Sequence, residues 1–213
     1  RYVGAAVFAA KAAVRAGAGL VTAAVPESVY PLVAAQMPEA MYRPLPERDG
    51  RFGEAAAAAL AQDPVACTCA AVGPGMSRFP GGEKFILGVL ETMPGRPVVF
   101  DADALHMLRG HWEAVRRLAG PVLLTPHPGE MAALLGDGVS ARDVERDRIG
   151  AARSFSEKWG FFVLLKGHRT IVAEPDGTVW INPIGSDALG KGGSGDVLAG
   201  LAAALLAQGA APR

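Results

Sequence analysis

The 213-residue sequence has few of the features that mark several large classes of protein. It contains two cysteines, Cys67 and Cys69, which in a strand would point to opposite faces and so predict neither a disulfide nor a metal pair. The charges of the 21 basic and 21 acidic side chains cancel, and no Lys/Arg cluster indicates nucleic-acid binding. No apolar run reaches the roughly 20 residues of a membrane span, and no secretory signal is present. The default expectation is therefore a cytoplasmic enzyme.

Two common nucleotide-binding motifs are also missing. No Gly-x-x-x-x-Gly-Lys-Ser/Thr loop occurs, which argues against a P-loop enzyme. No Gly-x-Gly-x-x-Gly follows the first predicted strand, which argues against a Rossmann dehydrogenase. Any phosphate site must therefore use a different glycine-rich loop.

The sequence does contain a regular alternation of helical and strand patterns. The predicted strands are residues 19–25, 69–72, 97–100, 121–124 and 161–165, and the predicted helices are 3–15, 28–36, 53–61, 82–93 and 141–159. Residues 171–181 predict a β-hairpin around Asp176-Gly177. The segment 37–52, rich in Pro, Glu and Arg, predicts a loop. This order favours one three-layer α/β domain with a mostly parallel sheet, helices on both faces and a late hairpin.

The most unusual stretch is Gly190-Lys191-Gly192-Gly193-Ser194-Gly195-Asp196, which an Ala/Leu helix follows. Glycines let a ligand approach the backbone, and a helix N-terminus suits a phosphate or a developing oxyanion. Asp196 would lie beside that anion site, where a carboxylate is badly placed to bind phosphate but well placed to take a proton. The alternative, a flexible linker before a surface helix, is disfavoured because linkers seldom lead into an acid and a long apolar helix.

Four further turns follow predicted strands, at the ends where ligands bind to open parallel sheets. Asp101 and Asp103 have the spacing to hold a metal–phosphate or a substrate hydroxyl, although Asp103 is also suited to cap the next helix. His127 is bracketed by two prolines and is predicted to contact a ligand. Glu130 is an acid favoured at a helix start. The turns are Gly73-Pro74-Gly75, Asp101-Ala102-Asp103, Thr125-Pro126-His127-Pro128-Gly129-Glu130 and Lys166-Gly167-His168-Arg169-Thr170.

Taken in order, the motifs GPGM, VVFDADAL, VLLTPHPGEMAALL, LLKGHRTIV and GKGGSGDVLAG resemble the ADP/ATP-dependent NAD(P)H-hydrate dehydratases. That family belongs to the ribokinase-like superfamily, and its members are often fused to an NAD(P)H-hydrate epimerase domain. The opening VGAAVFAAKAAVRAGAGLVTAAVPES is similar to the family's first helix–strand unit, so the resemblance covers nearly the whole chain.

The resemblance implies a repair reaction. ADP or ATP, with Mg²⁺, would phosphorylate the ring hydroxyl of (6S)-NADHX or NADPHX, and loss of phosphate would restore NADH or NADPH. Bacterial members typically use ADP. The resemblance makes Asp196 the base, assigns no Mg²⁺ ligands, and favours a homotetramer. By the same matching, the hydrated dinucleotide is bound by Ala5, Gly73, Gly75, His127 and Asp196. The nucleotide is bound by Lys166, Gly167, His168, Arg169, Thr170, Gly192, Gly193, Ser194 and Gly195, while Asp101, Asp103 and Glu130 are further candidates.

The sequence departs from the family pattern at two places. Ser186-Asp187 stands where relatives commonly have Asn-Pro, and the single domain predicted for residues 1–213 lacks the family's first glycine-rich strand and last helices. Two other functions stay open. One is a ribokinase-like kinase acting on a vitamin precursor such as hydroxymethylpyrimidine, pyridoxal or hydroxyethylthiazole. The other is a catalytically silent nucleotide-binding module, which the intact Asp196 and glycine loop disfavour.

Overall fold

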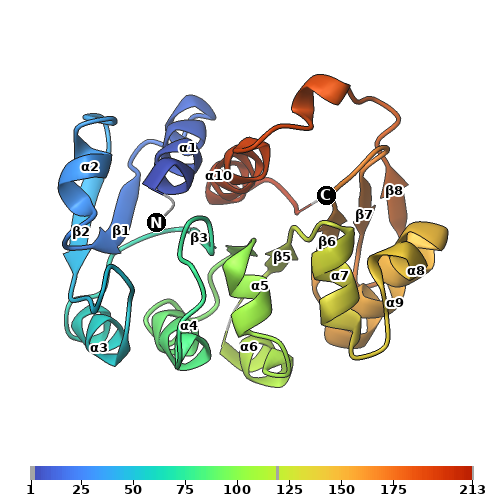
Figure 1. Cartoon of the computed structure of the whole chain (residues 1–213), viewed down its shortest axis with the longest axis horizontal. Helices are drawn as coiled ribbons and strands as arrows, with labels where there is room; N and C mark the ends of the chain where they lie inside the picture. Colours follow the sequence, from blue (N-terminus) through green and yellow to red (C-terminus); the bar gives the residue numbers. More distant parts are fainter. Residues whose placement is uncertain (1–2, 119, 213) are drawn as a thin grey trace.

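A computed structural model describes residues 3–118 and 120–212 of the chain, so Arg1, Tyr2 and Arg213 at the ends of the predicted domain lie outside it. Its strands form a six-stranded sheet in the order β3-β4-β5-β6-β7-β8 and a separate two-stranded sheet, β1-β2 (Figure 1). The first pairings of the larger sheet and the β1-β2 pairing are parallel, while β7 and β8 add in antiparallel fashion. The strands are β1 (Thr22–Pro26), β2 (Met41–Leu45), β3 (Ala70–Val72), β4 (Val98–Phe100), β5 (Val122–Leu124), β6 (Phe162–Leu165), β7 (Ile171–Ala173) and β8 (Val179–Ile181).

Helices cover both faces of the strands and make the structure three-layered, as predicted (Figure 1). One face carries α1 (Val3–Arg15), α2 (Tyr30–Ala34) and α10 (Ser194–Ala207). The other carries α3 (Glu54–Gln62), α4 (Gly82–Glu91), α5 (Asp103–Met107), α6 (Trp112–Leu118), α7 (Pro128–Leu135), α8 (Ala141–Arg146) and α9 (Arg148–Trp159). A 3-10 turn, η1 (Asp187–Leu189), precedes α10. The predicted hairpin and the first helix are confirmed.

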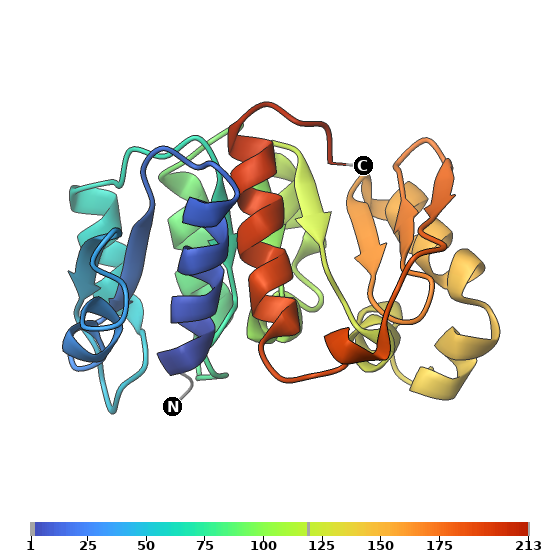
Figure 2. The same ribbon diagram turned by 90° about the horizontal axis from the view of Figure 1, so that it is seen from above.

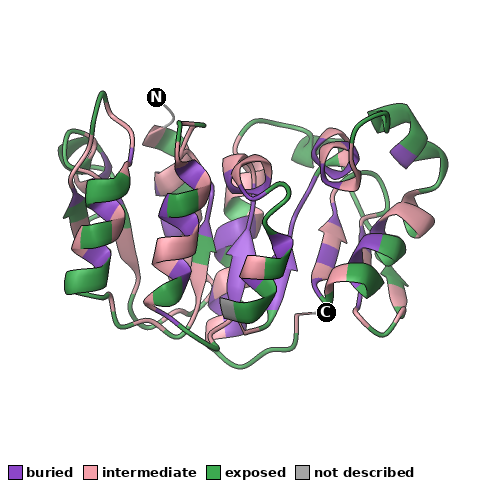
Figure 3. Ribbon diagram, turned by 90° about the horizontal axis from the view of Figure 1, so that it is seen from below, coloured by how far each residue is buried: buried purple, intermediate pink, exposed green. Residues whose placement is uncertain are grey.

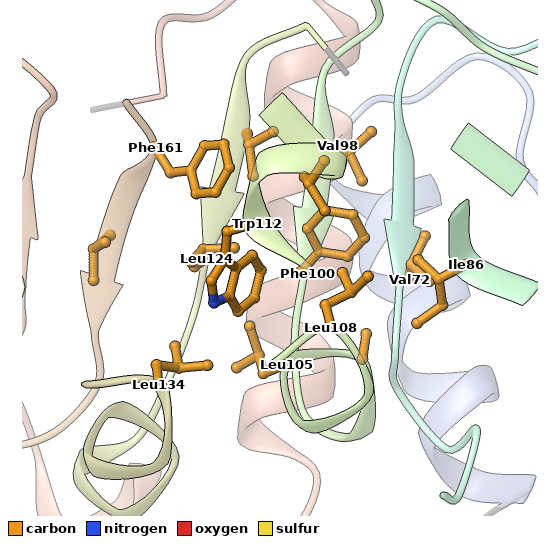
Figure 4. Packing of buried hydrophobic residues seen from close by; sticks show 14 of the residues in the cluster. Val72, Ile86, Val98, Phe100, Leu105, Leu108, Trp112, Leu124, Leu134 and Phe161 are labelled. Atoms are coloured by element: carbon orange, nitrogen blue, oxygen red, sulfur yellow. The ribbon is translucent and has the colours of Figure 1, made fainter. Parts of the chain in front are cut away.

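The core lies along β4 and β5, whose residues are all buried (Figure 3). Their side chains alternate: Phe100 and Leu124 face the α4–α6 layer, whereas Val99 packs with residues of α10 on the other side. Figure 4 shows the first cluster, in which the Trp112 ring lies edge-on to Phe161 with the ring centroids 6.0 Å apart. Burial of both faces explains why these strands are continuous apolar runs, each large side chain contributing roughly 1.5–3 kcal/mol.

The prediction that residues 37–52 form a loop is wrong, because β2 lies within them. The strand pairs with β1 along its length, from Thr22 opposite Met41 to Pro26 opposite Leu45. The sequence does not predict this strand, because Arg43 and Pro44 interrupt the apolar pattern that is typical of a strand. A proline is tolerated here since β2 is an edge strand with a partner on one side. Arg43 forms an ion pair with Asp63, with Nη1 and Oδ2 2.7 Å apart.

The single helix predicted for residues 141–159 is two helices, α8 and α9. Asp147 separates them with a non-helical backbone (φ −140°, ψ 73°), and its side chain accepts a hydrogen bond from the Gly150 N–H at 2.8 Å. Asp competes for backbone donors in this way, which is why it starts helices more readily than it continues them.

The two cysteines are free and contact different apolar clusters, but neither lies in a strand, because β3 begins at Ala70. Burial, followed by the neighbouring Cys67, raises the pKa of the Cys69 thiol to about 12. Cys69 therefore remains a thiol near neutral pH. Within the described residues, no helix combines the length and apolarity that a membrane crossing requires.

Candidate active site

The candidate site lies where the direction of strand order reverses. From β1 the chain moves to β2 at one edge, but from β3 it moves through β4, β5 and β6 toward the other. In open α/β sheets, ligands bind beyond the carboxyl ends of the strands at such a reversal. The turn that contains Gly73 follows β3 at this point. Helices α1 and α10 run side by side in the same direction (Figure 2). The Phe8 side chain of α1 lies against Gly193 at the start of α10, and the Gln208 side chain after α10 donates a hydrogen bond to the Ala16 carbonyl oxygen after α1.

A charged cluster ties together the ends of β4, β5 and β6. The Lys166 ammonium lies 2.7 Å from Oδ1 of Asp101 and 3.8 Å from Oε2 of Glu130. Asp101 is 2% exposed, and its Oδ1 also accepts a hydrogen bond from the Thr125 hydroxyl at 2.8 Å. One cation thus faces two buried carboxylates at the bottom of the site.

The glycine loop lies directly over this cluster. A Cβ atom built on Gly195 would be 3.5 Å from Lys166 Nζ and 3.8 Å from Asp101 Oδ2, so the backbone of the loop lies within van der Waals reach of this pair. Gly193 is the N-cap residue of α10 and has φ 92°, a left-handed conformation that glycine adopts without strain. The first-turn N–H groups of a helix have no partner within the helix, and they carry its positive dipole end. Loop and Lys166 together therefore make a cradle for an anion.

Asp196 occupies the first turn of α10, beside that cradle. Its pKa is raised above the usual value by burial and then by the negative charge of Asp101, while Lys166 acts in the opposite direction. A carboxylate with a raised pKa binds a proton more readily. A base next to an anion cradle can accept the proton of a hydroxyl that attacks a phosphoryl group. Asp196, Gly195, Lys166, Asp101 and Glu130 are thus brought together.

His127 and Glu130 form a reciprocal cap at the start of α7. The His127 Nδ1 accepts from the N–H groups of Gly129 and Glu130 at 3.0 and 3.2 Å, and Glu130 Oε2 accepts from the His127 N–H at 2.8 Å. Pro128 is the first helical residue. The imidazole side chain is 57% exposed, so it can still meet a ligand through its outer edge. Ligand contact by His127 stays a prediction, whereas Glu130 has two roles here, helix-start acid and partner of Lys166.

Asp103 does not join Asp101. Its carboxylate pairs with Arg78 at 3.6 Å, while Asp101 faces Lys166. Nor does Asp103 cap α5: the N-cap position is Ala102, and Asp103 is the first helical residue. Among the described residues, no group of three or more His, Cys, Asp or Glu side chains is arranged to hold a metal ion.

Two more turns border the site and depend on glycine. Gly73 has φ 125°, and a Cβ atom there would collide with the carbonyl oxygen of Asp101. Gly75 also has a positive φ, 73°. Gly167, φ 140°, lies against the guanidinium of Arg148. The remaining predicted nucleotide contacts, His168, Arg169, Thr170, Gly192 and Ser194, lie on the exposed or half-buried surface of the two loops, and Ala5 lies in the first turns of α1.

Arg148 is a site residue that the sequence did not reveal. Its Nη2 donates to the carbonyl oxygens of Leu165 and Lys166, each at 3.2 Å, and thereby holds the turn that presents Lys166. Arg148 follows the charged residues of the predicted helix 141–159, which predict a solvated face. No local sequence pattern distinguishes Arg148 from these residues. Thr125 was visible within the TPHPGE motif, but its contact with Asp101 depends on the pairing of β4 with β5.

Comparison with known proteins gives consistent results. The family model of the NAD(P)H-hydrate dehydratases matches residues 1–213. A bifunctional NAD(P)H-hydrate repair enzyme from Moorella thermoacetica is 42% identical over 210 residues, covering 98% of this chain and 39% of that protein. The chain therefore spans about two fifths of the length of that curated relative.

Comparison with solved structures supports the same family assignment. The ADP/ATP-dependent NAD(P)H-hydrate dehydratase from Bacillus subtilis, co-crystallised with ATP/Mg²⁺ and soaked with CoA, superposes with a TM-score of 0.74 and 32% identity over 97% of this chain and 70% of its own. A ribokinase-like superfamily protein from Enterococcus faecalis gives 0.77 at 26% identity over 97% of this chain and 68% of its own. The predicted ribokinase-like fold is confirmed.

Proposed function

The chain belongs to the NAD(P)H-hydrate dehydratase family, and from this membership we propose that it repairs hydrated NADH and NADPH with ADP as the phosphoryl donor. ATP is the alternative phosphoryl donor. The observation that carries the proposal is the position of Asp196, in the first turn of α10 beside the Lys166–Asp101 pair. A proton acceptor and an anion cradle at one place are what transfer of a phosphoryl group to a hydroxyl requires.

In the proposed reaction, Asp196 accepts the proton of the hydroxyl on the hydrated nicotinamide ring. The oxygen then forms a bond to the terminal phosphorus of ADP, and the bond from that phosphorus to its bridging oxygen breaks, releasing AMP. The phosphorylated hydroxyl leaves as inorganic phosphate with the C–O bonding pair. Loss of a proton from the neighbouring ring carbon restores the double bond of NADH or NADPH.

The anion cradle supports the nucleotide side of this proposal. Gly193 and Gly195 lie at the start of α10, where the first-turn N–H groups have no partner within the helix, and the Lys166 ammonium lies close to Gly195. Preorganised donors of this kind stabilise the charge of a transferring phosphoryl group. We propose that Mg²⁺ enters as part of the nucleotide substrate, bound to its phosphates. The turn 166–170 and Gly192–Gly195 would hold the nucleotide, with Arg148 fixing the turn.

The substrate side of the proposal uses the other turns. Gly73 and Gly75 border the site beside Asp101, and His127 presents its exposed edge from the start of α7. We propose that these residues, with Ala5 on α1, bind the hydrated dinucleotide. Asp103 is not part of this proposal, because its carboxylate pairs with Arg78 and not with Lys166.

The test is recovery of the NADH absorbance band when the protein is mixed with hydrated NADH, Mg²⁺ and either ADP or ATP. We expect recovery, and we expect Asp196→Asn to lower turnover by about 10²–10⁴-fold, the usual contribution of a general base. Binding of ADP, measured by calorimetry, should change little. Asp137→Asn is the matched control, since Asp137 is exposed and pairs with Arg109 away from the site.

No recovery with either nucleotide in the longest soluble form of the protein would refute the repair activity. Stable phosphorylation of a vitamin-type alcohol instead would identify a kinase of the same fold. Equal loss of ADP binding and of turnover in Asp196→Asn would mean that Asp196 is structural. Because one named relative is a bifunctional repair enzyme, we further propose an epimerase domain as a fused or separate partner. We also propose the homotetramer that the family resemblance implies, and light scattering tests it.

A further inference from the structure

The glycine loop before α10 has few hydrogen bonds that would fix its position. Every hydrogen bond that residues 183–193 form within the described part of the chain is to a residue no more than four positions away. The Gly190 N–H donates to the Asp187 carbonyl oxygen at 2.9 Å, and the Gly193 carbonyl oxygen accepts from the Val197 N–H at 3.0 Å. Glycines also leave the backbone free to adopt many conformations. A loop that holds phosphates in one geometry therefore needs a contact of another kind.

The Phe8 side chain of α1 supplies that contact. A Cβ atom built on Gly193 would lie 2.7 Å from Cε2 and 2.8 Å from Cδ2 of Phe8, so the edge of the ring lies against the Gly193 backbone. Long side chains of a helix point back toward its N-terminus. The ring accordingly reaches the start of α1, where its Cε2 is 3.9 Å from the Cβ position of Gly4. Phe8 therefore meets α10 at its N-cap residue, the end that carries the anion cradle.

The rest of α10 is fixed on α1 without Phe8. A Cβ atom on Gly200 would collide with the Ala9 carbonyl oxygen, so the two backbones are in direct contact there. At the far end, the Gln208 amide donates a hydrogen bond to the Ala16 carbonyl oxygen at 2.9 Å. Figure 2 shows the two helices side by side along their length. Loss of the Phe8 ring should therefore leave α10 in place and release mainly its first turn.

We propose that Phe8 is a positioning residue for the glycine loop. Its ring fixes Gly193, which starts the turn whose N–H groups form the anion cradle and whose Asp196 side chain is the proposed base. Gly195 in the same turn lies close to the Lys166 ammonium, so a shift of the loop would separate the cradle from its cation. The effect on catalysis rests on the proposed function, because it assumes that the loop holds the phosphates of the nucleotide.

The alternative is that Phe8 contributes only apolar packing between α1 and α10. Its truncation would then lower the stability of the whole protein and leave the loop unchanged. A positioning role predicts a local effect instead, because misplacement of reacting groups by about 1 Å can lower a rate by about 10²-fold. The two roles differ at the Val197 amide, whose bond to the Gly193 carbonyl oxygen is the first hydrogen bond of α10.

The first experiment measures amide hydrogen exchange at Val197 in the protein without ligand. We expect exchange about tenfold faster in Phe8→Ala, and within about threefold of the parent in Phe8→Leu, which keeps a branched apolar side chain. Gln208→Ala is the matched control, because it removes a contact between the same two helices at their other end and should leave Val197 unchanged. If Phe8→Ala does not fold, Phe8→Val takes its place. Unchanged exchange at Val197 in the truncated variant, or equal acceleration in Gln208→Ala, would overturn the proposal.

The second experiment measures binding of ADP with Mg²⁺ by calorimetry and the kinetics of the repair reaction in the same variants. In Phe8→Ala we expect about tenfold weaker ADP binding and a kcat lowered by about 10–10²-fold, and we expect both to return close to the parent values in Phe8→Leu. Unchanged ADP binding and kcat in Phe8→Ala, with a lower midpoint of urea unfolding, would assign Phe8 to packing alone. A parent protein without repair activity, combined with faster exchange at Val197 in Phe8→Ala, would refute the proposed function and still support Phe8 as the residue that positions the loop.

Discussion

The ion pair between Lys166 and Asp101 offers the most direct test of which interactions stabilise the candidate site. We consider Lys166→Met, which keeps most of the side-chain volume but removes the charge. The ammonium lies 2.7 Å from Asp101 Oδ1 and 3.8 Å from Glu130 Oε2, and the two carboxylates are 2% and 8% exposed at their side chains. Without the cation, two buried negative charges would face each other.

The cost follows from these distances. With an effective dielectric constant near 20, charges at 2.7 Å and 3.8 Å attract with about 6 and about 4 kcal/mol, before the desolvation of all three groups is subtracted. Breaking a buried pair by removing one partner usually costs about 3–5 kcal/mol. Because the Lys166 side chain is 21% exposed, and because Thr125 still donates to Asp101, we expect about 3 kcal/mol.

Urea unfolding of Lys166→Met, Asp101→Asn and the double variant measures this energy. The double variant removes both charges, so it should be less destabilised than the two single variants predict together, with a coupling of about 2 kcal/mol. Lys84→Met is the matched control, since Lys84 is an exposed lysine on α4, and it should change stability by less than about 0.5 kcal/mol. Additive single effects, or a loss below about 1 kcal/mol for Lys166→Met, would refute the reasoning.

Two further predictions concern Asp196 and Gly200. Since folding raises the pKa of Asp196 above its usual 3.8, the stability from this group is present at low pH and lost as pH rises through that window. Asp196→Asn should therefore have a higher Tm than the parent at pH 7, and this advantage should vanish near pH 3; a constant difference would contradict the assignment. Gly200→Ala should destabilise by about 1–3 kcal/mol in urea, because a Cβ atom there would collide with the Ala9 carbonyl oxygen between α1 and α10. Gly185→Ala, with no atom within 4 Å of its Cβ position, is the control, and equal losses would argue against close helix packing.

The sequence predicts much of the site because the chemistry lies at strand ends. DADAL, TPHPGE and KGHRT each follow a continuous apolar run, and parallel strands bring such ends together. The sequence therefore predicts that Asp101, Glu130 and Lys166 lie at one edge of the sheet. It did not predict that Lys166 lies between the two carboxylates, because that contact depends on strand register and on side-chain conformation.

Other features depend on neighbours that local patterns do not reveal. β2 contains Pro44, which conflicts with a central strand but not with an edge strand, and only its pairing with β1 decides between them. Asp147 has helical residues on both sides, yet its own side chain competes for the Gly150 N–H and breaks the helix. In the sequence, Arg148 is one of several neighbouring charged residues. Its role depends on the fold, which brings the carbonyl oxygens of Leu165 and Lys166 within hydrogen-bonding distance of its guanidinium.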